Sequence, residues 1–190
     1  MIYEIIASRR TIRKYKQRSV PKEVLEKCVD AARLSPSEAN RQPLKYCIID
    51  DPKLLKKAFS AVRWAGYLPE YSPDEKEMPR AYILILLDKN IHHDYGHDAG
   101  IAAMSISMVA YSRGIGSCIM GAIDRQSLKE FLNVPDRLDI ILAVALGYPA
   151  ETPIVDKVRD GDIKYWLDGN GVLHVPKRSS NDILCWNGYN

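Results

Sequence analysis

Apolar residues along the chain alternate between helical spacing and unbroken runs of strand length. From residue 19 to 37 (SVPKEVLEKCVDAARLSPS) they recur every three or four positions, which predicts a helix with Ser19 as its cap and Pro21 in its first turn. Residues 81–88 (AYILILLD) are apolar almost throughout, which predicts a strand that is buried on both faces. Residues 1–10 (MIYEIIASRR) place their isoleucines on one face and predict a short amphipathic helix.

The same patterns predict a layered domain with one central helix. Residues 96–114 (GHDAGIAAMSISMVAYSRG) are small or apolar on nearly every side, so we expect this helix at the centre of the molecule or between subunits. Further elements are predicted as short helices over 51–62 and 124–134, the second of them capped, and as strands over 44–50, 116–122 and 139–148. Together these elements predict an α+β fold in which helices flank a small central β-sheet.

Two segments lack such a pattern. Residues 64–80 (WAGYLPEYSPDEKEMPR) contain prolines, charges and aromatic residues, and we expect an irregular excursion that covers a substrate. Beyond Pro149 the periodicity fades, and we expect residues 160–190 to be an extended C-terminal tail or arm, wrapped over another surface rather than packed as regular elements. The length of the chain suits one domain over residues 1–190.

Composition narrows the class of protein. Hydrophobic residues make up 46% of the chain and charged residues 27%, and the formal net charge of +3 is too small to favour a nucleic-acid-binding protein. The four cysteines stand far apart, without the pairs of a zinc site or the pattern of a disulfide framework. The apolar runs are too short for a membrane span, and the N-terminus lacks the apolar core of a signal peptide. We therefore expect a cytoplasmic protein that binds neither nucleic acid nor membrane.

Two further motifs suggest chemistry that the rest of the sequence does not support. The segment HHDYGHD spaces His93 and His97 four residues apart, as on a metal-binding helix, but no distant third ligand stands out. We expect a capped helix start there and no metal. The segment RGIG has a G-x-G, but it lacks the third glycine and the strand–turn–helix context of a dinucleotide fold.

A basic run lies directly after the first predicted helix. The segment SRRTIRKY contains Arg9, Arg10, Thr11 and Arg13. These cations can stabilise the C-terminal end of a helix through its dipole. They can also enclose a phosphate, because a guanidinium group donates paired, charge-assisted hydrogen bonds to phosphate oxygens. The run alone does not decide between the two interpretations.

A polar loop follows the second predicted helix. The segment SPSEANRQPLKY places Ser37, Asn40 and Gln42 between a helix and a strand. Hydroxyl and amide side chains at a strand entrance can bind the edge of a polar heterocycle and a sugar chain. In isolation, the segment is better interpreted as an ordinary polar turn.

Taken together, the two segments resemble the nitroreductase family of FMN-dependent flavoproteins. The family motif R-[RH]-[ST]-x-[RK]-x-[FY] is matched from Arg9 to Tyr15, and A-P-S-x-x-N-x-Q-P-W is matched from Pro36 to Pro43. The segment RGIGSCIMGAI resembles the family's G-[LI]-G-[TS]-C-W-I-G-G, and LGYP and a late K-x-R pair continue the match in the same order. The resemblance covers most of residues 3–160.

The resemblance implies the nitroreductase-like fold, a bound FMN and the residues that would hold it. The FMN phosphate would be bound by Arg9, Arg10, Thr11, Arg13, Lys157 and Arg159. The ribityl chain and the isoalloxazine ring would lie against Pro36, Ser37, Asn40 and Gln42. Backbone amides around Met120 and Gly121 would face flavin N5 and O4. In the family this site lies at a homodimer interface and draws on both chains.

The reaction implied is hydride transfer from NADH or NADPH to flavin N5, followed by electron transfer to an electron-poor acceptor such as a nitroarene or a quinone, with ping-pong kinetics. No catalytic side chain is required, although Tyr67, Tyr71 or Tyr165 could donate a proton. Leu44 and Ile119 stand where the family has tryptophan, so substrate preference does not carry over. Two alternatives stay open: a flavin-binding or sensor protein without turnover, and a flavoenzyme of the same fold that carries out dehalogenation or azoline oxidation.

Overall fold

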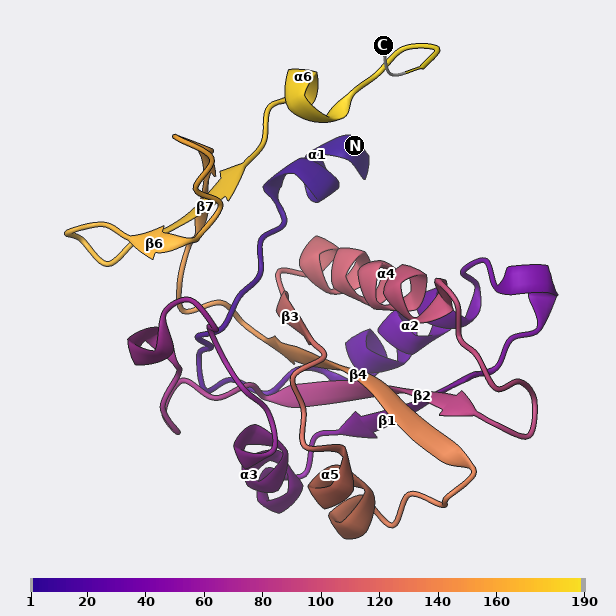
Figure 1. Cartoon of the computed structure of the whole chain (residues 1–190). Helices are drawn as coiled ribbons and strands as arrows, with labels where there is room; N and C mark the ends of the chain where they lie inside the picture. Colours follow the sequence, from indigo (N-terminus) through magenta and orange to yellow (C-terminus); the bar gives the residue numbers. More distant parts are fainter. Residues whose placement is uncertain (1, 189–190) are drawn as a thin grey trace.

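The computed structural model describes residues 2–188, and a four-stranded antiparallel sheet forms its centre (Figure 1). The strands follow one another across the sheet in the order β1 (Leu44–Ile49), β2 (Ala81–Asp88), β4 (Leu138–Gly147) and β3 (Gly116–Met120). The sequence predicted all four. Every residue of β2 is buried, as its unbroken apolar run indicated.

Helices cover both faces of this sheet, which explains why β2 has no polar side. The helices are α2 (Lys22–Arg33) and α4 (Asp98–Ser112) on one face and α3 (Pro52–Ser60) and α5 (Arg125–Leu132) on the other. Ile83 and Ile85 pack with α2 and α4, whereas Leu84 and Leu86 pack with α3 and α5. Because side chains alternate along a strand, both sets must be apolar.

The long apolar helix α4 lies in the layer that covers one face of the sheet, and its Ile101 is 37% exposed in the single chain. α4 packs against α2, β3 and β4, and it also contacts the short helix α1 (Ile2–Ser8). α1 buries none of its residues, and Ile2 and Ile6 are 68% and 44% exposed. The apolar face that the sequence predicted for this helix is therefore uncovered in the single chain. Within residues 2–188, no helix combines the length and apolar character needed to cross a membrane.

The helix caps agree only in part with the sequence. The side chain of Asp124 accepts a hydrogen bond from the backbone N–H of Ser127, which confirms the predicted cap of α5. Ser19 does not cap α2, because that helix begins directly after Pro21. The expected cap of α4 is also wrong: the helix follows His97, whose side chain makes no capping hydrogen bond.

The chain beyond Pro149 differs from the prediction. It forms an arm that extends away from the sheet and its helices (Figure 1), and this arm has regular structure. Its elements are β5 (Ile154–Lys157), β6 (Trp166–Leu167), β7 (Leu173–Lys177) and α6 (Ser180–Ile183), with the strands paired in the order β5-β7-β6. These strands are too short for a periodic pattern. The excursion over 64–80 is irregular, as predicted, apart from single helical turns at η2 (Pro69–Tyr71) and, elsewhere, η1 (Glu38–Asn40).

Candidate functional site

The basic segment runs along the edge of the main sheet instead of continuing a helix. α1 ends at Ser8, and the backbone N–H of Ile12 donates to the carbonyl of Ser117 in β3 at 2.9 Å. Thr11 pairs with Ser117 in an isolated bridge. The Arg10 guanidinium donates to the carbonyls of Arg9 and Ala7, so Arg10 does act at the end of α1.

Arg9 has no such role. Its side chain is half-buried, and its Nε is buried without a hydrogen-bond partner in the part of the chain that the structure describes. Burial, and then the charge of Arg10, lower the pKa of its guanidinium. A desolvated donor of this kind is stabilised by an anion brought to it. This orphaned donor fits a phosphate group.

Arg13 lies on a loop held by a carboxylate from the start of the arm. Glu151 accepts hydrogen bonds from the backbone N–H groups of Arg13 and Lys14, the second at 3.1 Å, and from the Tyr71 hydroxyl of the excursion. Burial, and then the hydrogen bond to Glu151, raise the pKa of Tyr71. The backbone of the basic segment is thus fixed at Arg13 and Lys14, while the guanidinium groups of Arg9 and Arg13 stay available. Over residues 2–188, no ion pair includes Arg9, Arg10 or Arg13.

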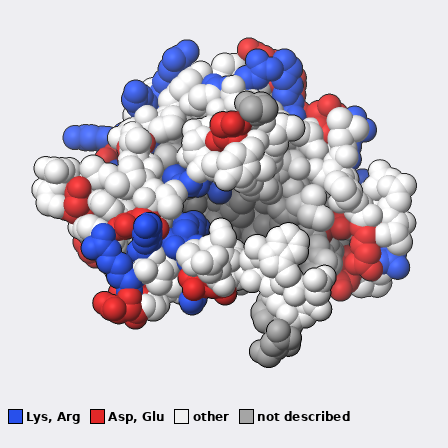
Figure 2. Space-filling view, turned by 90° about the horizontal axis from the view of Figure 1, so that it is seen from above, with Lys and Arg blue, Asp and Glu red and all other residues white. Residues whose placement is uncertain are grey.

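One cavity of about 180 Å³ brings together several residues that the sequence singled out. Arg13, Met120 and Gly121 line it, and the Arg13 guanidinium lies 4.7 Å from the centroid of the Tyr165 ring. Trp64 closes another part of the wall. The face of the molecule seen in Figure 2 is hollowed, with basic side chains along one side of the hollow.

The sequence did not single out Arg63 or Glu151 as site residues. Arg63 lines the same cavity as Arg13, and its backbone N–H donates to the carbonyl of Ala122 at 3.0 Å. That bond ties the start of the excursion to the chain after β3. Neither residue belongs to a motif, and their only sequence signal is their position beside the excursion and the LGYP segment.

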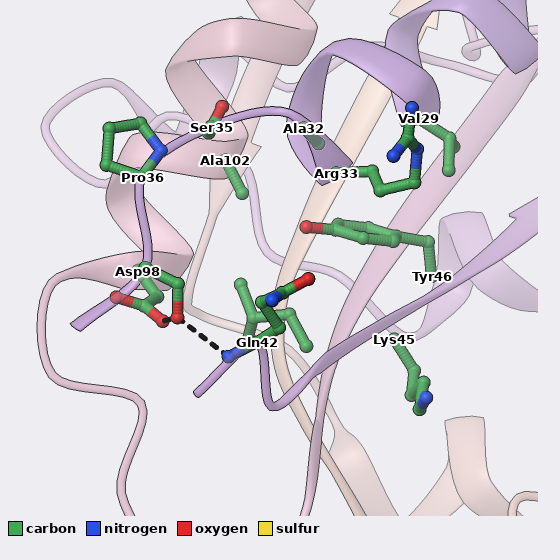
Figure 3. Close-up of a pocket in the computed structure, with 12 residues that line it drawn as sticks. Val29, Ala32, Arg33, Ser35, Pro36, Gln42, Lys45, Tyr46, Asp98 and Ala102 are labelled. Carbon is green, nitrogen blue, oxygen red and sulfur yellow. Dashed lines mark hydrogen bonds between the residues drawn. The ribbon is translucent and has the colours of Figure 1, made fainter. Parts of the chain in front are cut away.

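The polar loop lines a second cavity of about 360 Å³ between α2, β1 and α4 (Figure 3). Pro36, Ser37 and Gln42 contribute to its wall, together with Tyr46 and Asp98. Burial, and then the charge of Asp98, raise the pKa of Tyr46 to about 12. Asn40 is exposed and lies outside the wall, although its carbonyl and its side-chain oxygen both accept hydrogen bonds from the Gln42 amide.

Lys157 and Arg159 lie apart from both groups. They line a cavity of the arm with Trp166 and Asp156, and Arg159 approaches the Asp156 carboxylate at 3.8 Å. The single chain therefore distributes the predicted FMN residues among separate cavities. No group of three metal-ligating side chains occurs within residues 2–188.

Comparison with known proteins identifies the family of this chain. The model of the Nitroreductase family matches residues 6–148, which include the basic segment, the polar loop and the whole main sheet. The chain belongs to the nitroreductase family. Members of this family are FMN-dependent oxidoreductases, so the enzyme class and the cofactor expected from the sequence are confirmed.

Individual relatives agree with this assignment. A Methanothermobacter thermautotrophicus protein named "Putative NADH dehydrogenase/NAD(P)H nitroreductase" is 30% identical over 171 residues, covering 85% of this nitroreductase-family chain and 84% of the relative. An iodotyrosine deiodinase of Thermotoga neapolitana is 25% identical over 169 residues, covering 78% and 89%. The structure of an FMN-dependent nitroreductase of Clostridium difficile R20291 is 24% identical, covers 97% of this chain and 98% of its own, and has a TM-score of 0.69. That likeness confirms the predicted nitroreductase-like fold.

Proposed function

We propose that this chain transfers electrons from NADH or NADPH to an electron-poor acceptor, a nitroarene, a quinone or a similar small aromatic compound, with ping-pong kinetics. The observation that carries this proposal is that Arg9 and Arg13 pair with no carboxylate within residues 2–188, while Arg13 lines the cavity that also contains Met120 and Gly121. An FMN-dependent member of this family needs side chains that hold the phosphate of the cofactor, and these two arginines can do so. When bound, FMN supplies the two-electron redox chemistry, and the protein supplies position and electrostatics.

The residues of the basic segment fit the role of phosphate ligands. Among the described residues, the guanidinium groups of Arg9 and Arg13 have no carboxylate partner, and Glu151 fixes the backbone that carries Arg13. We assign the phosphate to this segment, with Arg10 and Thr11 beside it. Lys157 and Arg159 would close on it only if the arm of the chain approaches the segment. The remaining proposed ligands are Pro36, Ser37, Asn40 and Gln42 for the ribityl chain and ring, and Met120 and Gly121 for the edge of the ring.

The proposed site requires two chains. Ser37 and Gln42 line a cavity different from that of Arg13, so one copy offers the phosphate segment and a second copy offers the polar loop. Ile2, Tyr3 and Trp186, on α1 and near the end of the arm, are 68%, 77% and 80% exposed. Such large apolar side chains mark a contact surface. We therefore propose a homodimer with FMN at its interface.

The excursion and the arm supply the proposed substrate cover. The Tyr165 hydroxyl accepts a hydrogen bond from the backbone N–H of Tyr67 at 3.1 Å, and the two rings lie 5.1 Å apart between centroids. Trp64 and Tyr165 both line the cavity beside Met120 and form an aromatic wall there. An electron-poor aromatic ring would stack against such a wall. The four cysteines are free, which supports the cytoplasmic location that we propose.

A spectrum of the purified protein, followed by anaerobic addition of NADH and then NADPH, tests the proposal. We expect flavin absorbance bands that one of the nicotinamides bleaches, and re-oxidation by a quinone or a nitroarene. Bands that neither nicotinamide bleaches would favour the flavin-binding or sensor protein. No flavin after reconstitution with FMN would overturn the proposal.

One observation favours a second candidate, reductive dehalogenation. The T. neapolitana relative is named for deiodination, and Leu44 and Ile119 replace the tryptophans of the family motifs. Release of iodide from iodotyrosine by the reduced protein, at a rate above that of nitroarene reduction, would support this candidate.

A further inference from the structure

The carboxylate of Asp98, at the start of α4, lies in the wall of the cavity that Ser37 and Gln42 line (Figure 3). Asp98 is only 5% exposed, which is rare for a carboxylate. It accepts a hydrogen bond from the Ser37 hydroxyl at 2.6 Å and another from the backbone N–H of Glu38 at 2.9 Å. No cation pairs with it among the ion pairs of residues 2–188. Its partners are therefore the residues of the polar loop.

These contacts occupy most of the hydrogen-bonding capacity of Ser37. A serine hydroxyl has one proton to donate and two lone pairs to accept with. The Ser37 hydroxyl donates its one hydrogen bond to Asp98, and one lone pair accepts a hydrogen bond from the backbone N–H of Gln42 at 2.9 Å. One lone pair is left. Ser37 can therefore accept a hydrogen bond from a ligand, but it has no proton to donate to one.

The same contacts hold a loop whose backbone is strained. Ala39, Asn40 and Gln42 have φ values of 48°, 55° and 52°. Left-handed backbone in residues other than glycine persists only where surrounding contacts enforce it, and such strain clusters at functional sites. Asp98 accepts from the backbone N–H of Glu38, just before Ala39, and the Ser37 hydroxyl accepts from the backbone N–H of Gln42, the last of these left-handed residues. The loop is therefore fixed from α4 through one carboxylate.

We infer that Asp98 is a positioning residue of the FMN site. It accepts the hydrogen bond that the Ser37 hydroxyl donates, so Ser37 contacts the cofactor only as a hydrogen-bond acceptor. The group that binds at Ser37 must be a donor, which on FMN is the ring N3–H or a ribityl hydroxyl. This inference rests on the proposed function, because it assumes that FMN occupies this cavity.

FMN affinity of four variants tests the inference. We expect Ser37→Ala and Asp98→Asn each to weaken FMN binding on the order of tenfold, because each removes or reverses the acceptor at Ser37. The amide introduced by Asp98→Asn can still accept from Glu38 while it donates to Ser37, which turns the serine proton toward the ligand. The double variant is expected to bind no more weakly than the weaker single variant. Asp94→Asn is the matched control, because Asp94 is exposed and accepts only from nearby backbone N–H groups such as that of Gly96.

A second measurement does not depend on the folding of Asp98→Asn. FMN methylated at N3, and FMN analogues that each lack one ribityl hydroxyl, are titrated into the wild type and Ser37→Ala. One analogue is expected to lose affinity for the wild type and to bind Ser37→Ala as well as FMN does. A Ser37 hydroxyl that donated to the cofactor would produce no such dependence on a single ligand donor.

The outcomes separate the inference from the proposed function. The inference would be overturned if the losses of FMN affinity add up in the double variant, or if the wild type and Ser37→Ala bind the analogues in the same order of affinity. Binding of FMN by the wild type would still support the proposed site. A wild type that does not bind FMN would overturn both.

Discussion

Replacing Arg9 with methionine is expected to change cofactor affinity and stability in opposite directions. Arg9 Nε is buried and has no hydrogen-bond partner among residues 2–188, and burial lowers the pKa of the guanidinium. Without cofactor, the folded protein therefore holds at Arg9 a charge that no carboxylate of the described chain pairs with. Arg9→Met keeps the length of the side chain and removes the charge and the orphaned donor.

The magnitudes follow from the contacts. A buried donor left without a partner costs about 1–3 kcal/mol, which Arg9→Met removes, but the substitution also loses some packing. Without FMN, the variant is therefore expected to be as stable as the wild type or more stable by up to about 1 kcal/mol. A hydrogen bond between charged groups contributes about 1.5–3 kcal/mol, so loss of the contact to phosphate should weaken FMN binding by about 10- to 150-fold. Riboflavin has no phosphate, and its affinity should not change.

Two assays check this prediction. Quenching of flavin fluorescence gives the dissociation constants of FMN and riboflavin, and thermal unfolding of the cofactor-free protein gives the stability. Lys56→Met is the matched control, because Lys56 is exposed on α3 and pairs with Glu75 at 3.0 Å. Equal losses of FMN and riboflavin affinity, or a variant clearly less stable than the control, would refute the assignment of Arg9 to the phosphate.

Three further predictions concern the scaffold around the site. Gly147→Ala should destabilise the protein by about 1–3 kcal/mol in chemical denaturation and also weaken FMN binding, because a Cβ there would lie 2.8 Å from the Tyr15 ring beside the basic segment. Gly169→Ala is the control, because the space around Gly169 is open. A Gly147→Ala variant with unchanged stability and FMN affinity would contradict this packing. The hydrogen bond from Lys129 lowers the pKa of Asp139 more than burial raises it. The stabilisation by Asp139 is therefore present above the unfolded-state pKa of about 3.9 and is lost as the pH falls through the lower folded-state value. Asp139→Asn should reduce the melting temperature near pH 7 and match the wild type near pH 2, and a difference that persists in acid would contradict this linkage. Burial raises the pKa of the Cys28 and Cys118 thiols to about 11, so both should resist alkylation at pH 8 until denaturant unfolds the chain. Modification of Cys28 in the native protein would show that α2 leaves the sheet, and modification of Cys118 would show that β3 opens.

The main sheet and its helices could be predicted because their signals are local. Apolar spacing records which faces of an element are buried, and β2 shows this most clearly, since Ile83 and Leu84 enter different clusters on opposite faces. The segments around Arg9 and Ser37 could also be singled out from the sequence, because they resemble motifs of the family to which the chain belongs. The sequence by itself thus determined the fold class, the family and the cofactor.

The tertiary structure decided what depends on distant partners. β5 pairs with β7 about 20 residues later, Glu151 reaches back to Arg13, and Asp98 reaches back to Ser37. Each contact joins segments that carry no common periodicity, because a hydrogen bond between distant residues depends on the path of the chain between them. The separation of Arg13 and Ser37 into different cavities has the same origin: a motif shows which residue types occur in which order, but only the folded chain shows that these two residues line separate cavities.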